Sequence, residues 1–271
     1  MILFGDCLER LKEIPDNSVD LIFTSPPYAN QRKGLYSGVE PNKYVEWFIP
    51  IADELLRVLK PTGTFILNIK EGVVDGQRHT YVLELIVALQ ELGFLWTEEF
   101  VWHKTTSYPG KWPNRFRDAW ERLLQFNKEK KFNMYQEAVM VEPSETTKKR
   151  VAQLAKSDMT RRVNPNGTNM GARTANWLGR NKVYPSNVLQ VSVNAGNKNH
   201  PAVFPEKLPE WFIKLFTVPG DIVLDPFLGS GTTCIVAKRM GREYIGIEAK
   251  EEYFELAKTR IEGTNYQEGL Y

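Results

Sequence analysis

A short proline-containing motif, Thr24-Ser25-Pro26-Pro27-Tyr28, follows the apolar run Val19–Thr24 directly. A short, mostly apolar run of this length is typical of a buried strand. The two prolines fix their own φ angles and lack N–H donors, so the loop is stiff and offers carbonyl acceptors. Ser25 adds a hydroxyl that can accept a hydrogen bond, and Tyr28 adds a flat face. Such a loop suits an amino group on an aromatic ring, although a rigid turn without chemistry is the alternative.

The chemistry of a ring-bound amine explains why acceptors are needed. Its lone pair is delocalised into the ring, and acceptors on both hydrogens favour a tetrahedral nitrogen whose lone pair points at an electrophile. Positioning of this kind can lower a barrier by about 7–11 kcal/mol. Direct transfer needs no enzyme nucleophile, and neither cysteine, Cys7 or Cys234, stands in the Pro-Cys context that attack at a pyrimidine carbon would require. The predicted catalytic residues are Ser25, Pro26, Pro27 and Tyr28.

A glycine turn follows a second apolar strand near the C-terminus. The run Ile222–Asp225 is followed by Pro226-Phe227 and then by Gly229-Ser230-Gly231-Thr232-Thr233. Glycines let the backbone pass close to a ligand at the carboxyl end of a strand. A phosphate loop would need a lysine after the glycines, and a nicotinamide site would need a third glycine where Cys234 stands. The remaining interpretation is a nucleoside site that binds no pyrophosphate.

Two carboxylates fit that interpretation. Asp225 can meet a cationic amino-acid group, and Glu248, at the end of the next predicted strand, can accept both hydroxyls of a ribose. S-adenosylmethionine carries an ammonium, a sulfonium and a ribose but no phosphate, so it matches this polarity. The alternatives are a helix-capping role for Asp225 and a solvated strand end for Glu248. The predicted cofactor residues here are Asp225, Pro226, Phe227, Gly229, Ser230, Gly231, Thr232, Thr233 and Glu248.

Charge is distributed unevenly along a chain of ordinary composition. Apolar residues make up 42% and charged residues 25%, with a net charge of +2, values typical of a globular protein. Asn133–His200 contains ten Lys or Arg and four acidic residues, hence +6, which leaves −4 for the remainder. This asymmetry favours a basic surface for a polyanion, with a solvated insertion as the alternative. The residues predicted to bind the polyanion are Lys148, Lys149, Arg150, Arg161, Arg162, Arg173, Arg180 and Lys182.

The order of periodic segments predicts a largely parallel α/β sheet. A helix is expected over Lys43–Leu59, ended by Pro61-Thr62-Gly63 before a strand at Thr64–Ile69. Apolar periodicity fades between Asn133 and Asn199, so we expect one core interrupted by an irregular module. The expected parts are residues 1–132, 133–199 and 200–271. Other expected strands are Met1–Gly5, Trp96–His103, Glu121–Asn127 and Tyr244–Glu248, and other expected helices are Leu8–Ile14, Tyr81–Leu92, Leu208–Phe216, Cys234–Met240 and Glu251–Ile261.

The two motifs together resemble those of the DNA amino-methyltransferases of restriction–modification systems. The resemblance covers the chain apart from roughly Asn133–Val191. It implies a circularly permuted, Rossmann-like fold for an S-adenosylmethionine-dependent methyltransferase, with about seven mostly parallel strands and an inserted target recognition region. The permuted β arrangement follows from the catalytic motif preceding the cofactor motif. The resemblance adds to the cofactor residues Asp6, beside the adenine, and His200 and Phe204, beside the methionine end.

The resemblance implies methylation of the N4 amine of cytosine in duplex DNA, by base flipping and direct transfer. Within the family, serine at the first catalytic position favours N4-cytosine, as with Ser25. N6-adenine is the first alternative. The second is a non-catalytic nucleic-acid-binding module, which would be expected to carry a damaged motif.

The partners implied are double-stranded DNA and a cognate restriction endonuclease, with monomer or homodimer left open. No Cys-x-x-Cys or His-Glu-x-x-His pattern suggests a metal. The apolar runs are too short to span a bilayer, and no basic region precedes an apolar stretch at the N-terminus. A cytoplasmic location without membrane contact is therefore expected.

Overall fold

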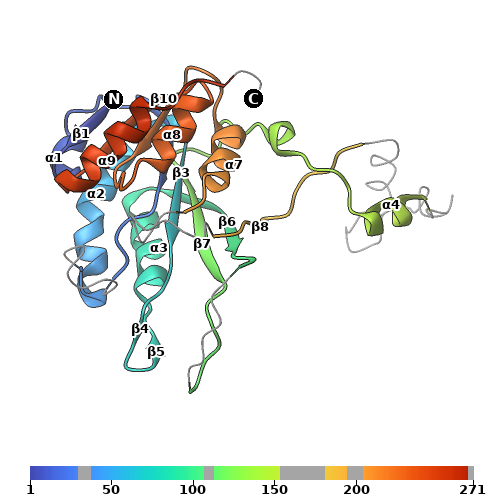
Figure 1. Cartoon of the computed structure of the whole chain (residues 1–271). Coiled ribbons are helices and arrows are strands. Elements are labelled where there is room, and N and C mark those ends of the chain that lie inside the picture. The colour runs from blue at the N-terminus through green and yellow to red at the C-terminus, as the bar shows by residue number, and fades with distance from the viewer. Residues whose placement is uncertain (30–37, 107–112, 153–180, 194–203, 268–271) are drawn as a thin grey trace. The chain divides into compact units, whose positions relative to one another are not determined.

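A computed structural model describes residues 1–29, 38–106, 113–152, 181–193 and 204–267 (Figure 1). The chain divides into two compact units, one made of Met1–Tyr135 with Asn187–Tyr271 and the other of Gln136–Ser186. The larger unit contains the sheet and the candidate catalytic and cofactor motifs, so it is described first.

The larger unit is built on an eight-stranded sheet with the order β1-β10-β9-β2-β3-β7-β6-β8. The first five strands in this order pair in parallel, whereas β7 is antiparallel to both β3 and β6. The prediction of a mostly parallel α/β sheet is confirmed. The strands are β1 (Ile2–Phe4), β2 (Val19–Thr24), β3 (Leu59–Ile69), β6 (Leu95–His103), β7 (Trp120–Asn127), β8 (Val188–Gln190), β9 (Ile222–Asp225) and β10 (Glu243–Glu248).

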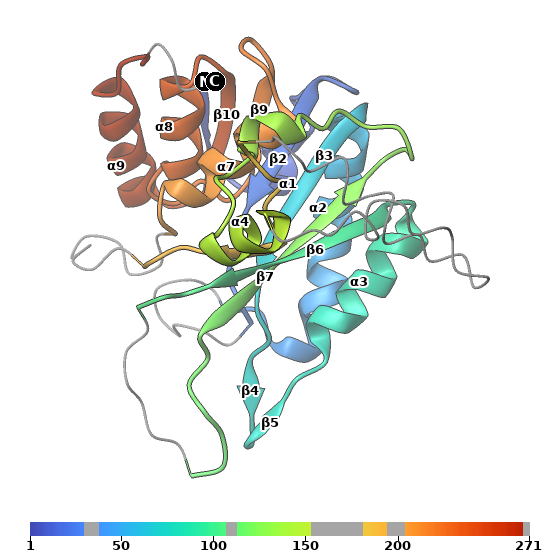
Figure 2. The same cartoon turned by 90° about the vertical axis from the view of Figure 1, so that its right-hand side faces the viewer.

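Helices cover both faces of this sheet, as Figure 2 shows. One layer holds α1 (Cys7–Leu11), α2 (Tyr44–Val58) and α3 (Tyr81–Leu92). The other layer holds α7 (Lys207–Phe216), α8 (Thr232–Arg239) and α9 (Glu251–Glu262). Short elements complete the unit: η1 (Pro41–Lys43), and the strands β4 (Val73–Val74) and β5 (Gln77–Arg78) of a small hairpin.

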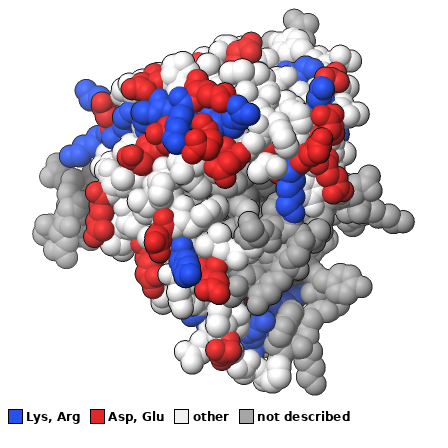
Figure 3. Space-filling view, turned by 90° about the vertical axis from the view of Figure 1, so that its left-hand side faces the viewer, with Lys and Arg blue, Asp and Glu red and all other residues white. Residues whose placement is uncertain are grey.

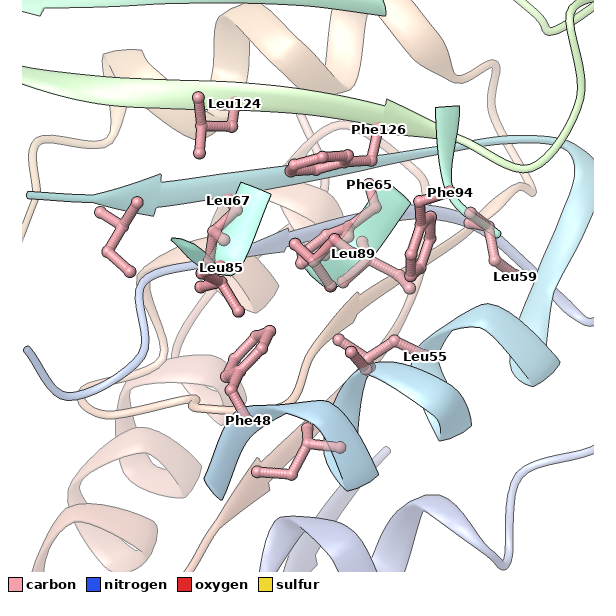
Figure 4. Close-up of a cluster of buried hydrophobic side chains, with 14 of the residues drawn as sticks. Phe48, Leu55, Leu59, Phe65, Leu67, Leu85, Leu89, Phe94, Leu124 and Phe126 are labelled. Carbon is pink, nitrogen blue, oxygen red and sulfur yellow. The ribbon is translucent and has the colours of Figure 1, made fainter. Parts of the chain in front are cut away.

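Burial on both sides explains the apolar sequence of the central strands. All six residues of β2 are buried, as predicted for a strand covered on both faces. On one face, α2 buries residues three or four positions apart, the spacing of a helix with one apolar side. The resulting core fixes the end of β2, where the Ser25 loop begins. Figure 4 labels part of it: Phe48, Leu55, Leu59, Phe65, Leu67, Leu85, Leu89, Phe94, Leu124 and Phe126.

The boundary between α2 and β3 differs from the prediction. The helix ends at Val58, and β3 begins at Leu59 and runs through the Pro-Thr-Gly segment that was expected to separate them. The physical reason is a bulge: Val19 pairs with Leu59, but Leu21 pairs with Thr64. A Cβ atom on Gly63 would lie 2.7 Å from Leu59 Cδ1, so the bulge needs the glycine that resembled a helix stop.

Elements from the two ends of the larger unit lie side by side. Strand β1 pairs in parallel with β10, and the Met1 amino group donates to the Tyr244 carbonyl at 2.6 Å. This adjacency is what the permuted motif order requires. In the described ranges, no helix is both long and apolar enough to cross a membrane.

The face of the larger unit that carries α1 and α2 mixes charges of both signs (Figure 3). Ion pairs join Lys12, at the C-terminal end of α1, to Glu9 at 2.9 Å, and Arg57 to Glu54 on α2 at 2.7 Å. Basic side chains on or next to these two helices are thus partly neutralised by acidic neighbours three residues away.

The smaller unit contains little regular structure in its described part. A 3₁₀ turn, η2 (Gln136–Val139), precedes the helix α4 (Glu145–Ala152), coloured light green in Figure 1. Val141 and Val183 form an antiparallel bridge through two backbone hydrogen bonds of 2.9 and 2.8 Å. The bridge links the chain before α4 to the chain after the undescribed residues 153–180.

Candidate active site

Four parallel strands bring the two motifs to one edge of the sheet. Strands β1, β10, β9 and β2 are neighbours with the same direction, so their carboxyl ends share an edge. Asp6 follows β1, Glu248 ends β10, Asp225 ends β9, and Ser25 follows β2. Ligands bind at this edge in open α/β sheets, in the crevice outside the carboxyl ends of the strands.

Asp225 joins the two loops. One carboxylate oxygen accepts from Thr24 Oγ1 at 2.7 Å, and the other accepts from Thr233 Oγ1 at 2.7 Å. The Phe227 amide also donates to Asp225, at 3.2 Å. The side chain is only 1% exposed, and this burial raises its pKa from 3.8 to about 6, although the three hydrogen bonds oppose the shift. The carboxylate therefore ties the end of β2 to the start of α8.

The glycine turn has the backbone geometry that its sequence predicts. Gly229 and Gly231 have φ angles of 52° and 85°, in the left-handed region that favours glycine. A Cβ atom on Gly231 would lie 3.1 Å from Ala257 Cβ, so close packing also requires glycine there. Thr232 Oγ1 is buried without a hydrogen-bond partner in the described residues. An unpaired buried hydroxyl at a ligand-binding turn is suited to a bond with a ligand.

Glu248 and Asp6 lie beside this turn. Glu248 Oε2 accepts from the Gly229 amide at 2.8 Å, and its Oε1 accepts from the Lys250 amide at 2.9 Å. Burial raises the pKa of Glu248. Asp6 is exposed and caps α1 through the Leu8 amide, at 2.9 Å. A carboxylate has about four acceptor positions, so both side chains keep acceptor capacity for hydroxyl or amino groups of a ligand.

The catalytic loop is held at three points. Thr24 is bonded to Asp225 at its start, and the Pro27 carbonyl accepts from the Tyr44 hydroxyl at 3.0 Å. The Tyr28 hydroxyl donates to Glu121 Oε2 at 2.8 Å. These anchors come from β9, α2 and β7, so the loop is fixed by three separate elements of the core.

A buried polar cluster surrounds the Tyr28 hydroxyl. Lys104 Nζ lies 2.5 Å from Glu121 Oε1, and Asn68 Nδ2 donates to Glu121 Oε2 at 3.2 Å. The Ser25 hydroxyl donates to the Tyr28 oxygen at 3.3 Å. Asn68, Lys104 and Glu121 are not among the site residues predicted from the sequence. The available signal was a polar residue at the end of one apolar strand and the start of another, Asn68 in β3 and Glu121 in β7.

Aromatic side chains pack around both loops. Phe204 packs edge-to-face against Phe23 in β2, with ring centroids 5.3 Å apart. It therefore lies beside the strand that leads to the catalytic loop. Phe227 lies 5.8 Å from the Trp47 ring of α2. Of the other predicted cofactor residues, Pro226 and Ser230 are buried in the turn, and His200 lies outside the described residues.

The two cysteines are unsuited to nucleophilic catalysis. Burial raises the pKa of Cys7 to about 12 and that of Cys234 well above its ordinary value. Both side chains therefore remain thiols near neutral pH, and the thiolate is the nucleophilic form.

The predicted DNA-binding residues belong to the smaller unit. Lys148 and Lys149 are exposed on α4, and Lys148 pairs with Glu145 at 2.8 Å. Lys182 is also exposed. Arg161, Arg162, Arg173, Arg180 and the Arg150 side chain lie outside the described residues.

Known proteins resemble this chain in sequence and in fold. The model of the family N6_N4_Mtase, described as DNA methylase, matches residues 19–259. The type II methyltransferase M.PvuII of Proteus hauseri is 34% identical over 285 residues, covering 97% of this chain and 84% of that protein. The solved PvuII DNA methyltransferase (cytosine-N4-specific) matches with a TM-score of 0.71 and 30% identity over 96% of this chain and 85% of its own. TTHA0409 of Thermus thermophilus, solved in complex with S-adenosyl-L-methionine, matches with a TM-score of 0.61 and 26% identity, covering 96% of this chain and 93% of that one.

Proposed function

Because the chain belongs to the N6_N4_Mtase family of DNA methylases, we propose that it methylates the N4 amine of cytosine in duplex DNA, using S-adenosylmethionine. The observation that carries this proposal is the shared sheet edge, where Asp225 bonds both the strand before the catalytic loop and the helix after the glycine turn. A cofactor at the turn would thereby lie beside Ser25. Nearness of this kind is what direct transfer between two bound groups requires.

The residues at the turn fit S-adenosylmethionine. Asp6, Asp225 and Glu248 give the edge an acidic character, which suits an ammonium and a sulfonium but would repel a pyrophosphate. Glu248 keeps acceptor positions for the ribose hydroxyls, and Asp6 keeps them for the adenine amine. The buried Thr232 hydroxyl offers a further bond. The predicted contact between Asp225 and the ammonium remains part of this proposal.

The catalytic loop supplies acceptors for the target amine. The cofactor provides a methyl group made electrophilic by its attachment to a positively charged sulfur. The Ser25 hydroxyl donates a hydrogen bond to the Tyr28 oxygen. The serine oxygen therefore keeps its lone pairs free to accept from an amine hydrogen. A backbone carbonyl of the Pro26-Pro27 pair accepts the second hydrogen. The Tyr28 ring stacks on the base, which must leave the duplex to reach this loop.

Cytosine is favoured over adenine for two reasons. Ser25 stands at the first catalytic position, and the PvuII enzyme that matches this chain is described as cytosine-N4-specific. N6-adenine is the second candidate, because an adenine amine presents the same pair of hydrogens to the same acceptors. The basic segment within residues 133–199 would recognise the target, and the type II relatives suggest a cognate restriction endonuclease as partner.

Label transfer tests the proposed activity. The native protein is incubated with tritiated S-adenosylmethionine and mixed-sequence duplex DNA, duplex RNA or free cytidine, with Ser25→Ala as the matched inactive variant. We expect label in duplex DNA with the native protein and at least about a 100-fold lower rate with Ser25→Ala, given the usual cost of losing one transition-state hydrogen bond. Label only in RNA or free cytidine, or equal label with both proteins, would contradict the proposal.

A further inference from the structure

The polar contacts around Tyr28 converge on one carboxylate. Glu121 is 7% exposed, and it accepts from Tyr28 at 2.8 Å and from Asn68 at 3.2 Å. The ammonium of Lys104 lies 2.5 Å from its other oxygen. An ionised carboxylate can only accept, so its position decides where the Tyr28 proton points.

The direction of the Tyr28 proton determines what Ser25 can do. A phenol has one proton, and the charged Glu121 oxygen at 2.8 Å is a better acceptor than the Asn68 oxygen at 3.3 Å. Because the Tyr28 hydroxyl donates its one proton to Glu121, its oxygen can only accept a hydrogen bond from Ser25, at 3.3 Å. The Ser25 oxygen then faces a base with lone pairs. If Tyr28 instead donated to Ser25, one of those lone pairs would be occupied.

The same link orients the tyrosine ring. The Tyr28 hydroxyl is bonded at one end of the side chain, and the stiff Pro26-Pro27 loop holds the backbone at the other. The loop is itself tied to Tyr44 at 3.0 Å. A ring fixed at both ends has little freedom to tilt, so its face is set before a base arrives. Preorganisation of this kind determines whether reacting atoms are aligned.

We propose that Glu121, charge-paired with Lys104, is a positioning residue that fixes the ring of Tyr28 and makes Ser25 a hydrogen-bond acceptor for the target amine. The proposal rests on the proposed function. Glu121 acts through Tyr28 and does not touch the base. No motif identified in the sequence contains either Glu121 or Lys104.

The test compares two buried, ion-paired glutamates. Glu71 is 8% exposed and pairs with Arg122 at 2.7 Å, so Glu71→Gln is a matched control for Glu121→Gln. The single-turnover rate of methyl transfer to duplex DNA is measured at saturating S-adenosylmethionine, alongside the Kd for the cofactor. We expect Glu121→Gln to slow transfer by about 10- to 100-fold, which corresponds to the loss of one hydrogen bond to a charged group, with the Kd unchanged. Glu71→Gln should leave the rate near that of the native protein.

A double-variant cycle shows whether Glu121 acts through the tyrosine hydroxyl. Tyr28→Phe keeps the ring, removes the link and leaves the buried charges paired, so it also serves if Glu121→Gln fails to fold. We expect Tyr28→Phe to slow transfer without changing the cofactor Kd, and Glu121→Gln to add less than about a twofold loss in that background. Native activity in Tyr28→Phe, or additive losses in the double variant, would overturn the proposal.

A measurement without DNA separates this proposal from the proposed function. The Cζ carbons of the tyrosines are labelled with ¹³C, and the Tyr28 resonance is identified by its disappearance in Tyr28→Phe. Glu121→Gln should move this resonance and Glu71→Gln should not. An unmoved resonance overturns the positioning role, whatever the activity. A moved resonance in a protein that transfers no methyl group supports the contact and contradicts the proposed function alone.

Discussion

The ionisation of Asp225 should make the stability of the cofactor-free protein depend on pH. Burial raises the pKa of this carboxyl from 3.8 to about 6. The folded state therefore holds the proton more tightly than the unfolded chain does. Stability from this group is fully present below the ordinary pKa and is lost as the pH rises through about 6. The complete loss corresponds to about 3 kcal/mol, at 1.36 kcal/mol per pKa unit.

Asp225→Asn isolates this contribution, because an amide does not ionise. The threonine hydroxyl that faces the new amide nitrogen, of Thr24 or Thr233, can turn to accept from it, while the other hydroxyl keeps donating to the amide oxygen. Any fixed change in packing cancels between pH values. Between about pH 4.5 and about pH 7, the variant should gain about 2 kcal/mol in free energy of unfolding relative to the native protein. Urea unfolding followed by tryptophan fluorescence measures this difference. Asp75→Asn, at an exposed position of the β4–β5 turn, controls for the loss of one carboxylate.

If the native protein and Asp225→Asn differ in free energy of unfolding by the same amount at every pH, the predicted ionisation effect is refuted. A constant difference would mean that the carboxyl is hydrated in the folded protein and not enclosed between the two loops. A difference that changes in the opposite direction would mean that the hydrogen bonds from Thr24, Thr233 and the Phe227 amide outweigh burial.

Three further predictions concern catalysis, DNA binding and packing. Ser25→Ala and Tyr28→Ala should lower methyl transfer far more than cofactor affinity, and an equal loss of both in an equilibrium titration would contradict their assigned roles. DNA binding through Lys148–Lys182 should weaken steeply with salt, with a log–log slope of about −4 to −5 for about five phosphate contacts; a flat response would contradict a basic DNA-binding surface. Gly246→Ala should lower the free energy of unfolding by about 1–3 kcal/mol, because a Cβ there would lie 2.7 Å from Leu228 Cδ1; urea unfolding with no shift would contradict this packing.

Strong periodicity made much of the fold predictable from the sequence. Strand β2 (Val19–Thr24) and helix α3 (Tyr81–Leu92) have the predicted bounds. Each is a long apolar or amphipathic segment with turn residues on both sides. Strand β8 (Val188–Gln190) was not predicted, because three residues are too few for a periodic pattern and β8 is held by pairing with β6. The same limit applies to the two-residue strands β4 and β5.

The candidate site was predictable only where its residues follow one another in the sequence. The Ser25 loop and the glycine turn each form a continuous motif, and the parallel sheet brings them together. Glu121 and Lys104 come from β7 and from the segment after β6, and neither has a neighbouring residue that marks it as functional. Their importance depends on a contact between Tyr28 and Glu121, 93 residues apart in the sequence. The contact becomes visible only when the folded sheet places β7 next to β3 and β3 next to β2.

The identity of the methylated nucleoside is the most direct test of the central claim. The native protein is incubated with S-adenosylmethionine and mixed-sequence duplex DNA, the DNA is digested to nucleosides, and the product is identified by mass spectrometry. We predict N4-methylcytosine, absent from the Ser25→Ala reaction. N6-methyladenine would keep the class of enzyme but overturn the assignment of the base. 5-Methylcytosine, or unmodified DNA from a protein that still binds the cofactor, would contradict amine methylation by the Ser25 loop.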